Sequence, residues 1–258
     1  MAEELEAALA AARRAGDVLR EGFGARHRVR FKGEVDIVTE TDERSEEVIR
    51  EALLGAYPTY GVLAEEGGEV VGEEDARWVV DPLDGTTNYA HGLPLFAVSI
   101  ALEKAGEVVV GVVHDPMRQE TFVAERGRGA RLDDESIGVS ETGELVRALV
   151  VTGFPYDRDE VPAALDLFGR LSMRTQSMRR LGSAALDLCY VAAGRLDAYY
   201  ERGGYPWDVA AGGLILEEAG GKITDYTGRP FETEGKEVVA SNGPLHPALV
   251  ELTGEYTG

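Results

Sequence analysis

The densest group of reactive residues lies in the segment DPLDGTTNYAHG, residues 81–92. Asp81 ends an apolar run and Asp84 follows a turn that proline restricts, so both carboxylates can point toward one site. Gly85 allows a close approach of the backbone, and the two threonines after it can begin a short helix whose N–H groups bind anions. Carboxylates that suit hard cations, beside amides that suit phosphate oxygens, predict metal-assisted phosphoryl transfer.

The same segment also has a purely structural interpretation. An aspartate at a strand-to-helix turn often serves as the N-cap and accepts hydrogen bonds from the first amides of the helix. Asp84 fits that description as well. The choice between a helix cap and a metal ligand therefore depends on the rest of the chain.

A second acidic feature is the pair Glu65 and Glu66, which follows the apolar run YGVLA at residues 60–64. Adjacent side chains of a strand point to opposite faces. Both can serve one site only if metals occupy its two sides or if the strand has already ended. Acidic pairs are also common on solvated surfaces, so the pair by itself favours a structural role.

Two single aspartates complete the set of candidates. Asp208 lies at the head of an expected helix, where small residues at 210–213 keep the surrounding wall narrow, and Asp42 follows the segment VDIVTET. An aspartate at the start of a helix is most often a cap. Each of these residues gains a functional interpretation only in combination with the others.

The elements that must position these residues follow from the hydrophobic pattern. Apolar residues at helical spacing predict helices at residues 5–19, 43–57, 161–171, 183–193, 207–221 and 247–252. Short apolar or alternating runs predict strands at residues 60–64, 78–81, 96–104, 108–115, 120–125, 129–132, 148–154, 195–201, 221–225 and 237–241. Hairpins between helical layers indicate an α+β layered sandwich.

Composition narrows the classes of function. The chain has 258 residues, 26 Lys plus Arg against 47 Asp plus Glu, and a net charge of −21. This charge disfavours direct binding to nucleic acid or to anionic membranes. We expect a soluble cytoplasmic protein, because no apolar run could span a bilayer and the N-terminus lacks a signal-peptide core. Scarce amide residues beside abundant Glu and Arg predict a thermophilic source.

Nucleophilic catalysis by cysteine or histidine is not indicated. Cys189 lies in an apolar helical segment and is interpreted as inert core. The four histidines show no spacing typical of a metal-ligand set. We therefore expect direct attack by water and no phosphoenzyme.

Taken together, the motifs resemble the inositol monophosphatase family over essentially the whole chain. The segments that carry the resemblance are DIVTETD, LAEEGG, WVVDPLDGTTNYAHGLPLFAVSIAL, LGSAALDLCYVAAGRLDAYYE and WDVAAGGLILEEAGGKITD. The resemblance implies a layered α-β-α-β-α sandwich of the inositol monophosphatase/fructose-bisphosphatase type. It also implies an N-terminal α+β subdomain at residues 1–145 with most metal ligands, and a C-terminal α/β subdomain at residues 146–258 that completes the site with Asp208.

The resemblance further implies a site that binds two or three Mg²⁺ ions. The expected ligands are Glu65, Asp81 and the carbonyl of Leu83 for the first ion, Asp81, Asp84 and Asp208 for the second, and Glu66 for a weaker third. Bound ions would let an acidic protein attract a phosphate dianion.

Other residues receive roles from the same resemblance. Asp42 and Thr86, with Glu65, are expected to orient and deprotonate the attacking water. The phosphate is expected at Gly85, Thr86 and Thr87. Substrate hydroxyls are expected at Asp84, Ser183, Ala184, Glu201 and Asp208. Lys32 matches a basic residue near the site.

The resemblance implies a small phosphorylated polyol or sugar, with inositol monophosphate first, as the substrate. It also implies a homodimer and inhibition by lithium. Tyr205 departs from many relatives in the loop before Trp207, so dual activity toward fructose 1,6-bisphosphate is the alternative. A protein-binding partner in transcription or RNA maturation and a catalytically inactive scaffold are two further alternatives.

Overall fold

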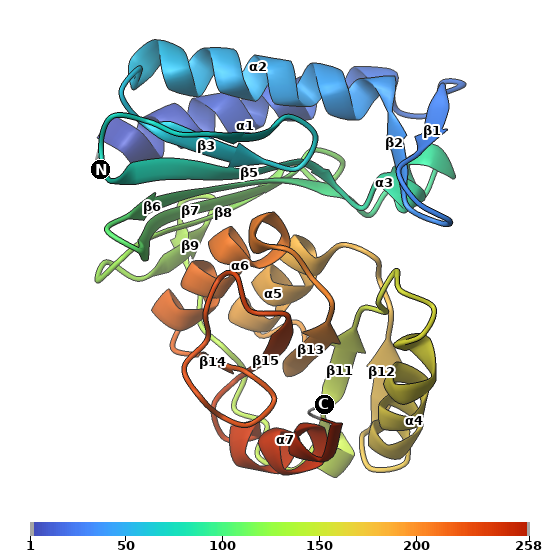
Figure 1. The fold of residues 1–258 in the computed structure, drawn as a ribbon. Helices are drawn as coiled ribbons and strands as arrows, with labels where there is room; N and C mark the ends of the chain where they lie inside the picture. The colour runs from blue at the N-terminus through green and yellow to red at the C-terminus, as the bar shows by residue number, and fades with distance from the viewer. Residues whose placement is uncertain (1–2, 257–258) are drawn as a thin grey trace.

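The computed structural model describes residues 3–256. Helices α1 (Glu3–Gly22) and α2 (Glu40–Ala56) form an outer layer, in which each helix turns one apolar stripe inward (Figure 1). Leu5, Leu19, Ile49 and Leu53 lie on these stripes and are fully buried. This periodicity explains why both helices pack against a sheet with one face and leave the other in solvent.

In the first sheet, successive side chains of strand Ala76–Asp84 point to opposite faces. Trp78 and Val80 face α1 and α2, while Val79 faces the core on the other side of the sheet. Its strands pair antiparallel except for the parallel neighbours β3 and β5. The order across the sheet is β10 (Glu135–Ser136), β9 (Ala130–Leu132), β8 (Glu120–Glu125), β7 (Glu107–Asp115), β6 (Ala97–Lys104), β5 (Ala76–Asp84), β3 (Gly61–Ala64) and β4 (Gly68–Val70).

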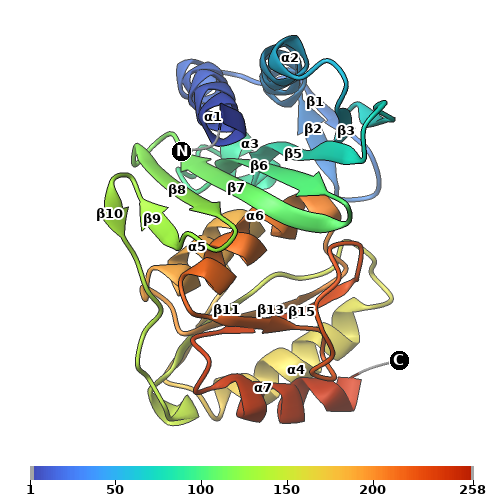
Figure 2. The same cartoon turned by 90° about the vertical axis from the view of Figure 1, so that its left-hand side faces the viewer.

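Helices α5 (Ala184–Ala192) and α6 (Pro206–Glu218) lie between the two sheets, as the turned view shows (Figure 2). Both are apolar around most of their circumference, which is typical of helices buried on all sides. Gly111 of β7 permits the close approach of α6, since a Cβ there would lie 2.7 Å from the carbonyl oxygen of Ala211. The two halves of the chain therefore share one core.

The second sheet closes that core from below, with α4 (Val161–Ser172) and α7 (His246–Thr253) on its outer face (Figures 1 and 2). Its order is β12 (Ser177–Arg179), β11 (Leu149–Thr152), β13 (Ala198–Arg202), β15 (Glu237–Ser241) and β14 (Lys222–Thr224). The smaller elements are the ribbon β1 (Val29–Phe31) and β2 (Ile37–Thr39), helix α3 (Thr86–Ala90), and the 3₁₀ turns Leu145–Arg147 and Gly254–Tyr256.

The α-β-α-β-α order of layers confirms the predicted fold class. Two predicted boundaries were wrong near the candidate site. Helix α2 begins at Glu40, three residues before the predicted start, because Thr39 acts as its N-cap. Strand β5 runs on to Asp84 and does not end at Asp81, because an irregular register absorbs Pro82 and Leu83.

Five strands, β1, β2, β4, β10 and β12, were not predicted. Four of them are exposed or half-buried, and all have two or three residues, so the hydrophobic pattern carried little signal. The division at residues 145 and 146 stays a proposal; it falls between the last strand of the first sheet and the first strand of the second. Among residues 3–256, no helix is both long and apolar enough to cross a membrane.

Candidate active site

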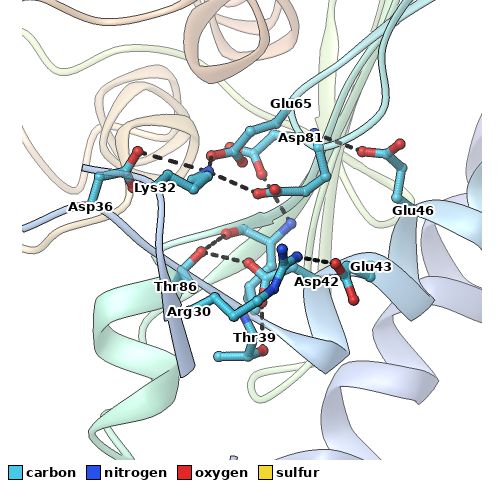
Figure 3. Close-up of polar contacts among 12 residues, drawn as sticks. Arg30, Lys32, Asp36, Thr39, Asp42, Glu43, Glu46, Glu65, Asp81 and Thr86 are labelled. Atoms are coloured by element: carbon cyan, nitrogen blue, oxygen red, sulfur yellow. Dashed lines mark hydrogen bonds and ion pairs between the residues drawn. The ribbon is translucent and has the colours of Figure 1, made fainter. Parts of the chain in front are cut away.

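The parallel pairing of β3 and β5 brings the first two acidic segments together. Ala64 lies opposite Val80, and the amide of Glu65 donates a 3.2 Å hydrogen bond to the carbonyl of Val80. Glu65 and Asp81 are thus adjacent across the sheet, where parallel neighbours in register point to the same face. Figure 3 shows their side chains side by side.

The irregularity in β5 sets the direction of its last residues. The amide of Leu83 donates a 2.9 Å hydrogen bond to Asp81 Oδ1, while the hydroxyl of Ser45 donates a 2.8 Å bond to the carbonyl of Pro82. An extra residue in a strand bends it and redirects its side chains. Asp81 and Asp84 consequently line the same cavity.

Asp84 also joins the two halves of the chain. Its Oδ2 accepts hydrogen bonds from Ser183 Oγ at 2.5 Å and from the amide of Ala185 at 2.8 Å, at the N-terminus of α5. Burial raises the pKa of Asp84 to about 6, although these hydrogen bonds lower it in part. The capping interpretation is therefore wrong for the helix that follows, because Gly85 is the N-cap of α3 and no side chain caps it. Asp84 instead accepts from the first amides of α5, whose N-cap is Ser183.

Asp208 reaches the cavity from the first turn of α6. Its Oδ2 accepts a 2.8 Å hydrogen bond from the amide of Tyr205, as in a capping box. Burial and then the charge of Asp84 raise the pKa of Asp208 well above its usual value. Burial and the charges of Glu65 and Asp84 do the same for Asp81. Burial and mutual repulsion thus disfavour the ionised forms of Asp81 and Asp208.

Lys32 is the cationic side chain that contacts Glu65 and Glu66. Its Nζ lies 2.6 Å from Glu65 Oε1 and 2.8 Å from Glu66 Oε1 (Figure 3). Burial raises the pKa of Glu65 to about 7 despite the opposing charge of Lys32. Burial disfavours the charged form of Lys32, but the combined attraction of Glu65 and Glu66 outweighs it and raises the lysine pKa.

Asp42 and Thr86 form the pair expected to activate water. The hydroxyl of Thr86 lies 2.8 Å from Asp42 Oδ1 and 3.0 Å from the carbonyl oxygen of Leu83. The other carboxylate oxygen of Asp42 accepts from the amide and the hydroxyl of Thr39. Burial raises the pKa of Asp42, and the hydrogen bonds from Thr39 and Thr86 partly offset the increase.

The opposite wall of the cavity comes from the C-terminal half. Glu201 Oε2 accepts a 2.5 Å hydrogen bond from the hydroxyl of Tyr199, and burial raises the pKa of Glu201 to about 7. A Cβ on Gly153 would lie 2.1 Å from the carboxyl group of Glu201, so the backbone at Gly153 packs directly against that group.

Most of the predicted site residues line this one cavity: Glu65, Asp81, Leu83, Asp84, Gly85, Thr86, Thr87, Ser183, Ala184, Glu201 and Asp208. Asp42 and Glu66 do not line the cavity. Asp42 accepts a hydrogen bond from Thr86, which does line it, and Glu66 contacts Lys32, which also contacts the cavity residue Glu65.

The donor chemistry of the cavity suits a hard divalent cation, because carboxylate and carbonyl oxygens are the ligands that Mg²⁺ prefers. Within residues 3–256, however, no group of three Asp, Glu, His or Cys side chains has the spacing that holds an ion. The carboxylates bond to protein donors instead, such as Lys32 for Glu65 and Ser183 for Asp84. Burial is the main cause of the raised pKa values of Asp81, Asp84 and Asp208, and a bound cation would favour their ionised forms.

Several residues of the site were missed in the sequence, among them Glu46, Arg180 and Asp187. Glu46 is buried in α2, and its Oε2 accepts hydrogen bonds from the amides of Glu66 at 2.9 Å and Gly67 at 3.2 Å. Arg180 and Asp187 line the cavity. A signal existed for Asp187, since it occupies an inward position in a helix whose other inward residues are mostly apolar.

Comparison with known proteins agrees with the fold. The family model described as inositol monophosphatase family matches residues 1–257. The Nus factor SuhB of Pasteurella multocida is 44% identical over 92% of this chain and 91% of its own. Inositol monophosphatase 2 of Solanum lycopersicum is 42% identical over 99% of both chains. The crystal structure of extragenic suppressor protein suhB from Bartonella henselae has 39% identity and a TM-score of 0.94, and covers 98% of both chains.

The layered fold and its acidic cavity define a class of phosphoric monoester hydrolases. The chain belongs to the inositol monophosphatase family. That family acts on phosphorylated polyols and is generally magnesium-dependent.

Proposed function

We propose that this chain hydrolyses a small sugar or polyol phosphate monoester in a Mg²⁺-dependent reaction, with inositol monophosphate as its principal substrate. The observation that carries the proposal is the convergence on one cavity of Glu65, Asp81, Asp84 and Asp208, beside the hydrogen-bonded pair Asp42 and Thr86. The family membership supports the same conclusion.

The carboxylates would hold two or three Mg²⁺ ions, which supply Lewis-acid stabilisation of the phosphoryl group and a bound water of lowered pKa. The expected ligands remain Glu65, Asp81, Leu83, Asp84 and Asp208, with Glu66 for a third ion.

The protein's own residues would move one proton. Thr86 donates its hydroxyl proton toward Asp42, so that a lone pair of the same oxygen is free to accept a proton from the attacking water. The hydroxide would attack phosphorus and the phosphorus–oxygen bond to the polyol would break. The leaving polyol oxygen takes up a proton from solvent, and Asp42 returns to solvent the proton that it accepted. Burial makes Asp42 a stronger base than an exposed aspartate, because it raises the pKa of that group.

The phosphate would lie against the amides of Gly85, Thr86 and Thr87 at the start of α3, which have no partner within the helix. Glu201, Ser183 and Ala184 would contact hydroxyl groups of the leaving polyol. Water attack requires no covalent intermediate, and buried Cys189 takes no part, since burial and the charge of Asp84 raise the thiol pKa well above its usual value.

The experiment is phosphate release, with and without Mg²⁺, from inositol 1-phosphate, fructose 1,6-bisphosphate, histidinol phosphate, glycerol 2-phosphate and NADP. Magnesium-dependent release led by inositol 1-phosphate is expected. Release led by fructose 1,6-bisphosphate would support the dual-specificity alternative that Tyr205 leaves open. No release from any ester by folded protein would overturn the proposed function.

A second candidate function rests on the 44% identity with a Nus factor SuhB. We propose that a protein partner in transcription or RNA maturation, and not bare nucleic acid, would be the target of such a role. The net charge of −21 supports this choice. The test is a pull-down from native extract with the wild-type chain and with an inactive Asp84→Asn variant. If both proteins capture the same partner from the transcription machinery, the binding is separate from catalysis.

A further inference from the structure

Helix α5 carries one buried acidic side chain that the proposed reaction does not use. Asp187 is 2% exposed in the segment AALDLCYVA, whose other residues, apart from Cys189 and Tyr190, are purely aliphatic. Its Oδ1 is buried and has no hydrogen-bond partner among residues 3–256. A buried polar atom without a partner destabilises the fold, so its presence calls for an explanation.

A second buried aspartate shows how this chain treats a structural carboxylate. Asp197 accepts hydrogen bonds from Ser140 Oγ at 2.5 Å and from the amide of Leu149 at 2.7 Å. Both of its oxygens are satisfied, as is usual for a buried carboxyl group. Asp187 differs from Asp197 in that its surroundings leave hydrogen-bonding capacity unused.

The position of Asp187 indicates what would use that capacity. It lies one turn along α5 from Ser183 and lines the same cavity as Ser183, Glu201 and Arg180. Glu201 is already held by the hydroxyl of Tyr199. Arg180 has no ion pair or hydrogen bond among the residues that the structure describes. Burial raises the pKa of Asp187 well above its usual value, and the charge of Arg180 opposes that rise only in part.

An incoming hydroxyl group matches this arrangement. A hydroxyl can donate to an ionised carboxylate and can accept from a protonated carboxyl group, so the match does not depend on the ionisation of Asp187. An aromatic or alkyl leaving group would leave Oδ1 unpaired. A site that hydrogen-bonds a substrate hydroxyl discriminates most strongly against substrates that lack this hydroxyl.

We propose that Asp187 is a specificity-determining residue that hydrogen-bonds a hydroxyl of the substrate, separate from the hydroxyl at Glu201. The site then selects polyol monophosphates with at least two free hydroxyls on the leaving group. This inference rests on the proposed phosphatase function and extends it to a residue outside the expected ligand and substrate sets.

The test compares wild type, Asp187→Asn and Asp187→Ala on inositol 1-phosphate and on para-nitrophenyl phosphate at saturating Mg²⁺. We expect Asp187→Ala to lose roughly 10- to 100-fold in kcat/KM on the inositol ester, mostly through KM, and about threefold or less on the aryl ester. Asp187→Asn keeps the shape and one acceptor, so its loss on the inositol ester should be smaller.

Thermal unfolding separates this role from a structural one. Because Asp187 is unpaired, both variants should keep or raise the melting temperature. The matched control Asp197→Ala removes partnered hydrogen bonds, so it should lower the melting temperature and leave the ratio of the two activities unchanged. A lowered melting temperature in Asp187→Asn, with equal loss on both esters, would assign Asp187 to the fold and overturn the inference.

A binding measurement keeps the test independent of turnover. Free myo-inositol with Mg²⁺ and inorganic phosphate should raise the melting temperature of the wild type more than that of either Asp187 variant. Equal shifts in all three proteins would overturn the role of Asp187 even if the enzyme proved active. Absence of magnesium-dependent release from every ester by the wild type would instead refute the proposed function itself.

Discussion

The two walls of the active cavity come from different halves of the chain and hold their carboxylates differently. The N-terminal wall places Glu65, Asp81 and Asp84 at the ends of two paired strands. The C-terminal wall places Asp187, Glu201 and Asp208 on separate elements, α5, β13 and α6. The ladder of hydrogen bonds between β3 and β5 fixes the relative positions of Glu65 and Asp81, whereas the relative positions of α5, β13 and α6 depend mainly on packing.

This difference suggests a division of labour. The rigid strand ends would bind the ions and set the geometry of phosphoryl transfer, which tolerates little displacement. Asp187 and Glu201 of the C-terminal wall would contact the leaving group, so changes at these two residues would alter selectivity more than the reaction itself. Asp208 of the same wall would bind an ion. Asp84 connects the two walls through its hydrogen bonds to Ser183 and Ala185.

The largest effect is expected at Asp84. Replacement of Asp84 by Asn removes the ligand charge but keeps the volume, and its carbonyl oxygen can still accept from Ser183 and Ala185. We expect kcat to fall about a thousandfold or more while the protein stays folded. Phosphate release and circular dichroism measure the two quantities. Asp134→Asn, on an exposed turn, is the matched control, and near-wild-type activity of Asp84→Asn would refute the proposed metal site.

A smaller and selective effect is expected at Glu201. The Glu201→Gln variant keeps the contact with Tyr199 but loses the charge that strengthens a hydrogen bond to a substrate hydroxyl. Activity toward inositol 1-phosphate should fall roughly tenfold or more relative to an aryl phosphate. If both activities fall equally, Glu201 acts on the reaction and not on recognition, and the proposed division between the walls fails.

Glu46 tests how the N-terminal wall is supported. Its carboxylate fixes the amides of Glu66 and Gly67, so Glu46→Ala leaves two donors without their partner. We expect Mg²⁺ affinity to fall about tenfold, with partial recovery in Glu46→Gln. Calorimetric titration measures the affinity directly. The neighbouring exposed Glu47→Ala is the control, and equal affinity in the Glu46 and Glu47 variants would contradict the role.

The smallest effect concerns stability against pH in the absence of metal. Burial raises the pKa of Glu65 and of Glu201 to about 7, so the folded protein binds more protons than the unfolded chain and loses stability as pH rises. The lowered pKa of His114 and of His246 acts in the opposite sense, but only below the ordinary histidine pKa of about 6.5.

Between pH 6.5 and pH 8, the carboxyl groups therefore dominate. The melting temperature in a chelator should fall by about 5 °C or more across this window, and saturating Mg²⁺ should abolish the decline. Thermal unfolding followed by circular dichroism gives both curves. A melting temperature that rises with pH in the chelator would show that these carboxyl groups are neutralised by the protein itself.

Some of this site was determined by the sequence alone. Asp81, Asp84 and Gly85 lie within five positions of one another, so a proline-restricted turn was enough to indicate a joint role. The layered fold followed from helical and alternating periodicities, because both depend on neighbouring residues. The extension of β5 to Asp84 was missed, since an irregular register leaves no local hydrophobic signal.

Only the tertiary structure decided which distant residues meet. Glu65 reaches Asp81 through the parallel register of β3 and β5, and the hydrogen bonds from Ser183 and Ala185 to Asp84 span about 100 positions. The unsatisfied oxygen of Asp187 has meaning only when every neighbour is known. Local sequence specifies the dihedral preferences and periodicity of each element, whereas contacts between elements depend on how whole layers pack, and that packing is a property of the complete chain.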